Sequence, residues 1–383
     1  MLFSEQDHLT QYGYYKVGDI KTFCKHEAFL FANHDISKIE YIFNDEVYSQ
    51  YDWTQEPSED LYSLFDERAK QLRSNYDYII LFYSSGTDSQ TILDTFLRNN
   101  LRIDELCSLY HQGPKVSFIN DEIYSNVIPL AKKLNIKLKL IDCSPELLNL
   151  DHNDIEFISN HSLSKFYIVR DSHIIKKRMM QEYDDLIKKG KKICLIWGYE
   201  KPRIFYDSEN KSYNFKFFDI STNHAIGYMF HNTPIVDENF FWSKDCPKII
   251  IKHCHQVKNV LLKIPKESHL LCSFDDLPNG GPYFEHSEGK YLNYESSIKV
   301  IYPKLLYDKT QEPRLKFGKT IGRIFTQADR WLIESNHESQ IKFYSKIKSL
   351  SDNYRNYFIR KYNTLYSIKL FYTKSYTIHK LEN

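Results

Sequence analysis

The chain has 383 residues, more than one average domain, and its 42% hydrophobic and 26% charged composition supplies a folded core and excludes global disorder. Its 51 basic and 50 acidic residues leave a formal net charge of +1, which excludes a protein that binds polyanions through its whole surface. Seven cysteines without a C-x-x-C pair argue against a disulfide framework. No apolar run approaches the roughly 18 residues that span a bilayer, and the acidic N-terminus lacks a signal-peptide layout. We therefore expect a cytoplasmic protein with no membrane contact.

The first predicted elements form a short N-terminal region. Residues 1–57 are typical of short strands and loops. Ser58 is the predicted cap of a helix, because the two acidic residues after it suit the positive end of the helix dipole. Apolar residues at helical spacing continue that helix to about Asn75: Leu61, Leu64, Phe65, Ala69 and Leu72.

A β–α alternation follows. Residues 78–83 form a continuous apolar and aromatic run, which is typical of a strand buried on both faces of a parallel sheet. A helical pattern begins after residue 89. Three more strands are predicted over residues 106–110, 137–142 and 192–197. Helical patterns separate these strands over residues 121–134 and 155–189. In the first of them, Pro129 either kinks the helix or marks its true start.

This alternation predicts an α/β fold, a doubly wound parallel sheet over about residues 76–205. A hairpin is expected over residues 206–219, turning at 208–210, and helices are expected over 245–262 and 326–362. We predict three parts, which are the N-terminal strands and helix (1–75), a nucleotide-binding domain (76–225) and a mainly helical C-terminal region (226–383).

Residues 84–89, Ser-Ser-Gly-Thr-Asp-Ser, are the strongest candidate for a functional site in the sequence. The start of a helix offers unpaired backbone N–H groups and a positive dipole end, and Gly86 permits close approach and unusual backbone angles. The serine and threonine hydroxyls can donate to phosphate oxygens. Asp88 repels phosphate unless a metal intervenes, which implies Mg²⁺, or it caps a backbone N–H.

A strand, then S-G-G-x-D-S, then a helix is the signature of the PP-loop ATP pyrophosphatases, a HUP-like (adenine nucleotide alpha-hydrolase-like) superfamily that this segment resembles. Ser85 stands where the family has its first glycine. The resemblance implies that Ser84, Ser85, Gly86, Thr87 and Ser89 bind the pyrophosphate part of ATP. It also implies that Asp88 helps to place Mg²⁺ and that Leu109 and Tyr110, at the end of the next strand, lie on the adenine side.

The pattern after the loop most resembles the catalytic domain of asparagine synthetases, which have a glycine and acidic residues after a later strand. Here Gly198, Glu200, Lys201 and Arg203 follow the strand at 192–197, and ligands of open α/β sheets bind at that edge. We assign them to the substrate. Position 2 is Leu rather than the family's catalytic cysteine, so the nucleophile is expected to be ammonia, a substrate amine or a group delivered by a partner protein.

Two basic segments extend the prediction. Lys316 and Lys319 either fold back to stabilise the charge that develops on the phosphates or belong to a solvated loop. Residues 341–383 carry nine Lys and Arg against two acidic residues, with seven interleaved tyrosines, so this tail either binds nucleic acid or presents a solvated basic face over aromatic core positions.

The sequence therefore predicts an ATP-dependent, AMP-forming ligase without a glutaminase domain. An oxygen of the acceptor, a small molecule or nucleobase, attacks the α-phosphorus, pyrophosphate leaves, and an amine or ammonia displaces AMP. Two alternatives stay open. One is a PP-loop enzyme that modifies a nucleobase in tRNA or DNA or their precursors, and the other is a nucleotide-binding module without catalysis.

Overall fold

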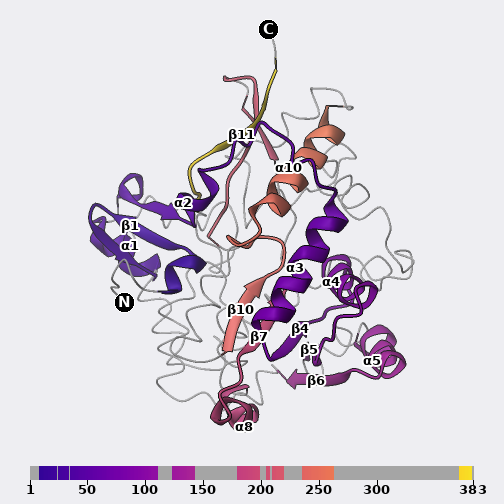
Figure 1. The fold of residues 1–383 in the computed structure, drawn as a ribbon. Coiled ribbons are helices and arrows are strands. Elements are labelled where there is room, and N and C mark those ends of the chain that lie inside the picture. Colours follow the sequence, from indigo (N-terminus) through magenta and orange to yellow (C-terminus); the bar gives the residue numbers. More distant parts are fainter. Residues whose placement is uncertain are drawn as a thin grey trace.

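The computed structural model describes residues 8–23, 25–33, 35–110, 123–142, 179–198, 204–207, 209–219, 235–262 and 371–381, and all that follows concerns these residues. Its centre is a five-stranded parallel sheet with helices packed against it (Figure 1). The strands, in sheet order, are β10 (Ile235–Asn239), β7 (Ile193–Trp197), β4 (Tyr78–Phe82), β5 (Glu105–Tyr110) and β6 (Lys137–Asp142). The predicted α/β class is confirmed, and four of the five strands lie where the apolar runs predict them.

The order of the strands reverses once along the chain. From β4 the chain runs outward through β5 to β6, then returns to the other side of β4 for β7 and continues to β10. All four pairings are parallel, so the five carboxyl ends lie at one edge of the sheet. In open α/β sheets, ligands bind at the carboxyl edge where the order reverses, which here lies between β4 and β7.

Both faces of the sheet are buried. Ile79 and Leu81 of β4 belong to one apolar core, which includes side chains of α3 (Leu61–Asn75), α4 (Thr87–Arg98), α5 (Ile128–Leu134) and α10 (Pro247–Leu261). Ile80 and Phe82 belong to a second core on the opposite face, against which α8 (Asp184–Lys188) packs. Alternate residues of a strand point to opposite faces, so a continuous apolar run is what this doubly covered strand requires.

Helix α3 ends at Asn75 as predicted, but Ser58 does not cap it. Asp60 is the N-cap, and its carboxylate accepts hydrogen bonds from the backbone N–H of Tyr62 at 2.9 Å and of Ser63 at 3.1 Å. The prediction was two residues early because a serine and an aspartate cap equally well, and the cap falls directly before Leu61, the first buried residue of the helix.

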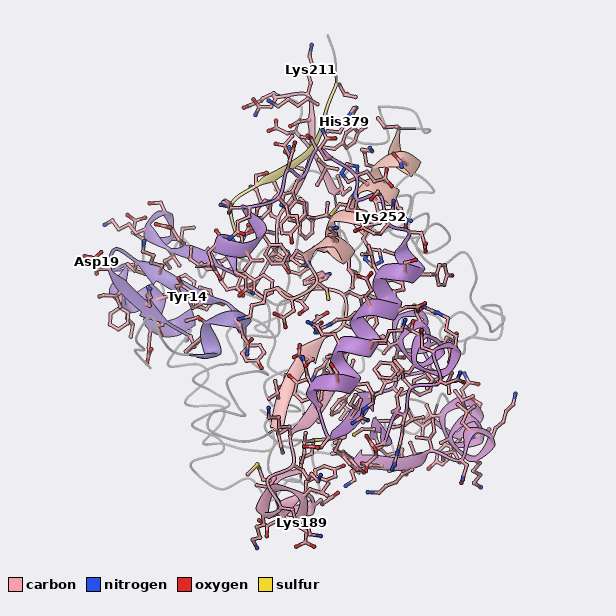
Figure 2. All side chains as sticks on the ribbon, in the orientation of Figure 1. Tyr14, Asp19, Lys189, Lys211, Lys252 and His379 are labelled. Atoms are coloured by element: carbon pink, nitrogen blue, oxygen red, sulfur yellow. The ribbon has the colours of Figure 1, made fainter. Side chains whose placement is uncertain are left out.

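Helix α10 holds the segment that leads into α3. Lys252, labelled in Figure 2, pairs with Glu56 at 2.8 Å and donates to the carbonyl oxygen of Pro57 at 2.8 Å. The helix predicted over residues 245–262 is thus confirmed as α10, whereas residues 326–362 lie outside the described part of the chain.

Pro129 marks a change of helix type. A π-helical turn, Ile123–Val127, precedes α5, and Pro129 lies in the first turn of α5. Of the two predicted alternatives, the structure therefore supports a start of the α-helix at this proline, where its missing N–H costs no hydrogen bond.

Two three-stranded sheets flank the parallel sheet. In the N-terminal one, of order β2-β1-β3, β1 (Tyr14–Val17) pairs with β2 (Ile20–Thr22) and β3 (Glu40–Ile42). Around it lie the helices α1 (Lys25–Phe31) and α2 (Asp45–Tyr48) and the 3₁₀ turns His8–Tyr12 and Ile36–Lys38.

In the other sheet, of order β11-β9-β8, the expected hairpin is formed by β8 (Ile204–Asp207) and β9 (Ser212–Phe215). Its third strand, β11 (Tyr376–Lys380), comes from the far end of the sequence and was not predicted. Strand β10 also lies past residue 225, so the region predicted to be mainly helical supplies a strand to the parallel sheet. No helix among the described residues is long and apolar enough to span a membrane.

We expect Asp60→Ala to lower the free energy of unfolding by about 1 kcal/mol, because three donors of the first helical turn lose their acceptor. Ser58→Ala is the matched control and should change it by less than about 0.5 kcal/mol. Urea denaturation of both variants measures this, and an equal loss for the two would contradict the assignment of the cap.

Candidate functional site

The segment over residues 84–89 lies at the predicted place, because it follows β4, runs into the first turn of α4 and lies beside the point where the strand order reverses. Helix α4 begins at Thr87 and Gly86 is its N-cap, which has no side chain to satisfy the first N–H groups of the helix. Ser84 is exposed and Asp88 is half-buried, while Ser85, Gly86 and Ser89 are buried. The helix start therefore combines a positive dipole end with two exposed or half-exposed polar side chains.

The loop is closed by its own serines. The Ser89 hydroxyl accepts from the backbone N–H of Ser84 at 3.2 Å and donates to the carbonyl oxygen of Gly86 at 3.1 Å. The Ser84 hydroxyl accepts from the N–H of Gly86 at 3.4 Å and lies 3.4 Å from the Ser89 hydroxyl. The structure thus brings together three of the predicted phosphate-binding residues. Their mutual bonds are long, so an anionic oxygen could replace them without breaking a strong interaction.

The unusual backbone angle of the loop is at Ser85, not at Gly86 as we expected. Ser85 has φ of +53°, in the left-handed region that favours glycine, whereas Gly86 is extended with φ −74° and ψ 163°. The turn therefore needs a glycine-like angle at the position where the PP-loop signature has its first glycine, and this chain places a buried serine there. The Ser85 hydroxyl accepts from the side-chain amide of Asn126 at 3.4 Å, a contact from the π-helical turn before α5 that the sequence did not indicate.

Hydrogen bonds to β5 hold the backbone directly after β4. The N–H of Tyr83 donates to the carbonyl oxygen of Cys107 at 2.8 Å, and the Ser108 hydroxyl donates to the carbonyl oxygen of Tyr83. The Tyr83 hydroxyl donates to the side chain of Gln90, which in turn donates to Asp94 at 2.8 Å. The backbone just before the loop is therefore tied both to the neighbouring strand and to the first turns of α4.

Gly198, a predicted substrate residue, directly follows β7 and lies close to the start of α4. A Cβ atom at this position would lie 2.9 Å from Cδ1 of Ile92 and 3.3 Å from the backbone carbonyl carbon of Asp88. A larger residue at position 198 would require the Ile92 side chain and the Asp88 backbone to shift, so glycine fits this approach to α4 best. The structure therefore brings Gly198 and Asp88 together, while Glu200, Lys201 and Arg203 lie outside the described residues.

The predicted adenine-side residues lie one strand away. Leu109 and Tyr110 are the last residues of β5, next to β4, and both are half-buried. The Tyr110 hydroxyl lies 3.0 Å from that of Tyr124, and their rings are nearly perpendicular at 6.4 Å between centroids. Their position at the carboxyl edge fits a role beside the loop, which remains a prediction. Lys316 and Lys319, predicted to act on the phosphates, lie outside the described part of the chain.

Three polar contacts of Asp237 and Glu238 on β10 were missed by sequence reasoning. The Trp197 indole N–H donates to Oδ1 of Asp237 at 2.6 Å. Burial raises the pKa of Asp237 well above its ordinary value, Glu238 adds to the rise, and the Trp197 hydrogen bond opposes it. The Glu238 carboxylate in turn accepts from the buried Arg68 at 2.6 Å and from the Tyr76 hydroxyl at 2.6 Å. The only sequence signal was an acidic pair within an apolar segment.

The polar groups of residues 84–89 suit Mg²⁺ bound together with phosphate oxygens better than a metal ion bound by protein ligands alone. No group of three or more His, Cys, Asp or Glu able to hold a metal occurs among the residues the structure describes. Mg²⁺ commonly binds through one or two carboxylates and the oxygens of its phosphate substrate, so the single half-buried carboxylate of Asp88 is compatible with that ion.

No protein-family model matches the sequence, and no curated protein matches it. Among solved structures the chain is similar to the NMN synthetase from Francisella tularensis, with 13% sequence identity, over 74% of this chain and 97% of that chain, at a TM-score of 0.25. A TM-score this low carries no argument about fold or function. The α/β fold therefore rests on the pairing and order of the strands.

We expect Ser85→Gly to be more stable than Ser85→Ala by about 1 kcal/mol. Both variants lose the hydroxyl and its contact with Asn126, so the pair isolates the backbone angle. Urea denaturation measures the difference, and equal stabilities would show that Ser85 does not hold a left-handed conformation in solution.

We expect Asp237→Asn to become more stable relative to the wild type as the pH rises. The raised pKa of Asp237 means that the folded state keeps a proton that the unfolded chain loses above its ordinary value of 3.8. Wild-type stability tied to this proton is complete below that value and is lost as the pH rises to the folded-state pKa, by at most about 1.4 kcal/mol per pH unit. Urea denaturation of both proteins at pH 5, 6, 7 and 8 measures the trend, and a constant difference would contradict it.

Proposed function

We propose that this chain is an ATP-using enzyme of the PP-loop type, which binds the triphosphate of ATP at residues 84–89. The observation that carries the proposal is the position of this hydroxyl-rich loop. It joins a strand buried on both faces to the uncapped N-terminus of a 12-residue helix, at the edge where the strand order reverses.

In the proposed complex, the backbone N–H groups at the start of α4 and the hydroxyls of Ser84, Thr87 and Ser89 hold the β- and γ-phosphates. Gly86 lets the backbone approach them. Asp88 would hold Mg²⁺, which neutralises phosphate charge when bound. Because a Cβ atom at Gly198 would lie 3.3 Å from the backbone of Asp88, we expect the acceptor to bind near residue 198, beside the phosphates.

The reaction we propose is AMP-forming ligation of the asparagine synthetase type. A carboxylate, amide or carbonyl oxygen of the acceptor attacks the α-phosphorus, the bond to the bridging oxygen breaks, and pyrophosphate leaves. Ammonia or an amine, free or delivered by a partner protein, then adds to the activated carbon and AMP departs. Lys316 and Lys319 are proposed to stabilise the phosphate charge, and Glu200, Lys201 and Arg203 to contact the acceptor.

A nucleotide-binding module without catalysis is the second candidate, and one observation favours it. The PP-loop signature has glycine at the position of Ser85, and here a serine is held at φ +53° with its side chain buried. The backbone keeps the glycine-like angle, but the buried serine side chain fills space that a glycine would leave open beside a reacting phosphate.

The nucleic-acid alternative rests on the basic, tyrosine-rich tail over residues 341–383. In its described part, Phe371 and Tyr376 are buried, and the Tyr376 ring stacks on Trp53 at 4.4 Å between centroids. These two rings serve the core, so binding of RNA or DNA would depend on the rest of the tail.

The test is ATP binding by calorimetry in the presence of MgCl₂, together with pyrophosphate release in the presence of a panel of carboxylic acids and ammonium chloride. We expect Ser84→Ala and Asp88→Ala to weaken ATP binding about 10-fold, since each removes one charge-assisted contact, and to abolish pyrophosphate release. Ser74→Ala on α3 and Asp19→Ala beside β1 are matched exposed controls that should leave both unchanged.

The outcomes separate the candidates. Equal ATP binding by all variants would remove the loop from nucleotide recognition. Binding that depends on Ser84 and Asp88 without pyrophosphate release across the panel would favour the non-catalytic module. Release that requires added tRNA would favour nucleobase modification.

A further inference from the structure

A cavity lies at the carboxyl end of β10, where that strand meets the N-terminal region. Its volume is about 430 Å³, including the part that is open to solvent. It is lined by residues 237–239 and 242–245, at the end of β10 and in the turn after it, and by residues 11–12 and 43–44 of the N-terminal region. Since the five strands are parallel, this end of β10 lies at the same edge of the sheet as the end of β4.

Hydrogen bonds fix the N-terminal side of the cavity. The Tyr12 hydroxyl donates to the backbone carbonyl oxygen of Asp237 at 3.1 Å, which joins the two sides. The side-chain amide of Asn44 donates to the carbonyl oxygen of Gln11 at 2.8 Å, so the two N-terminal segments also hold each other. The cavity is therefore framed by specific polar contacts between segments that are distant in sequence.

Three lining residues on the strand side have a buried polar atom without a hydrogen-bond partner among the residues that the structure describes. These atoms are Oδ2 of Asp237, Nδ2 of Asn239 and Nε1 of Trp242. Asp237 is 3% exposed and Trp242 is 2% exposed. Leaving one buried polar atom unpaired costs about 1–3 kcal/mol, so three of them beside one cavity indicate that a bound molecule completes their bonding.

The three atoms are hydrogen-bond donors. The indole nitrogen of Trp242 can only donate. Oδ1 of Asn239 accepts from the backbone N–H groups of Phe241 at 2.9 Å and Trp242 at 3.0 Å, which leaves the NH₂ group of Asn239 to donate. Oδ1 of Asp237 accepts from Trp197, and burial raises the pKa of Asp237, which favours a proton on Oδ2. Three donors select a ligand with acceptor oxygens over a metal ion or an amine.

The charges around the cavity also suit an anionic group. The Glu238 carboxylate is already compensated, because it accepts from Arg68 and from the Tyr76 hydroxyl, each at 2.6 Å. The side chain of Asp245 is 44% exposed and lies 4.0 Å from Arg68, so its charge is both solvated and opposed. Lys244 is half-buried and forms no ion pair with a described residue. Its ammonium group is therefore the positive charge at this cavity that is left to balance a ligand.

We propose that this cavity binds the carboxylate group of a small organic acid, whose two oxygens accept from Asn239, Trp242 and Asp237 and whose charge Lys244 balances. A carboxylate offers about four lone pairs on two oxygens, enough for all four groups. The inference does not rest on the proposed function, because none of residues 84–89 lines the cavity. An acid bound here lies at the same edge of the sheet as residues 84–89, two strands away from β4.

The test uses sodium acetate as the probe and the indole N–H signals of the full chain in a ¹H–¹⁵N NMR spectrum as the readout. The chain has four tryptophans, and the signal of Trp242 is assigned by its loss in Trp242→Phe. At constant ionic strength, we expect that signal to shift saturably, with half-saturation at about 1–10 mM acetate. The Trp53 N–H already donates to the carbonyl oxygen of Tyr48 at 2.9 Å, so its signal is the internal control and should not move.

Asn239→Asp is the decisive variant. It keeps Oδ1 for the two backbone N–H groups but replaces the NH₂ donor with an oxygen that repels a carboxylate, so the half-saturation concentration should rise at least tenfold. Asn33→Asp makes the same change at an exposed residue that does not line the cavity, and it should stay within twofold of the wild type. If Asn239→Asp does not fold, Lys244→Gln decides, with an expected rise of at least threefold.

The outcomes leave no intermediate case. A Trp242 signal that does not shift with 100 mM acetate, or shifts equally with sodium chloride, would overturn the proposal and leave ordered water as the occupant. A saturable shift with methylammonium chloride but not with acetate would show a site for a cation and overturn it too. Because the titration contains no nucleotide, acetate binding in a protein that binds no ATP would support this site and overturn the proposed function alone.

Discussion

The position of the candidate site follows from one constraint, the reversal of strand order at β4. Helix α4 leaves β4 toward one face of the sheet, whereas the segment that enters β7 packs on the opposite face. Because crossovers between parallel strands are right-handed, the two connections diverge at the carboxyl ends of β4 and β7. This is the place in the described sheet where a helix N-terminus and the end of a buried strand meet. The phosphate-binding role proposed for residues 84–89 depends on that meeting.

Two energetically unfavourable features lie in this part of the sheet. Ser85 is held in a left-handed conformation, and Asp237 buries a carboxyl oxygen without a partner among the described residues. Each costs on the order of 1–3 kcal/mol, and such costs persist only where the surrounding structure fixes the conformation. Here the two apolar cores that cover both faces of β4 and β7 supply the rigidity. Strain of this kind within a well-packed sheet is typical of sites that are formed before a ligand arrives.

Local patterns predicted the parts of the fold that local physics decides. The apolar run of β4 is buried on both faces, and the residues of α4 follow helical spacing, so both could be predicted from the sequence. Strand β10 could not, because Ile-Val-Asp-Glu-Asn is a poor strand until Trp197 and Arg68, distant in sequence, satisfy its acids. The contact between Asn126 and Ser85 could not be predicted either, because the two residues are distant in sequence. The motif predicted which residues form the loop but not which of them bears the strained angle, since that depends on how tightly β4 must turn into α4.

The N-terminal region contacts one edge of the parallel sheet. Strand β10 is at the edge of the sheet, and an edge strand left open invites pairing with other chains. Tyr12 bonds to the carbonyl oxygen of Asp237, and Arg68 bonds to that of Asn239 at 3.3 Å, so side chains from the N-terminal third occupy acceptors at this edge. The same Arg68 holds Glu238, which fixes β10 against α3. Tyr12 and Arg68 therefore tie the N-terminal third of the chain to the β10 edge of the parallel sheet, so the described part of that region is packed onto the sheet and is not an independent appendage.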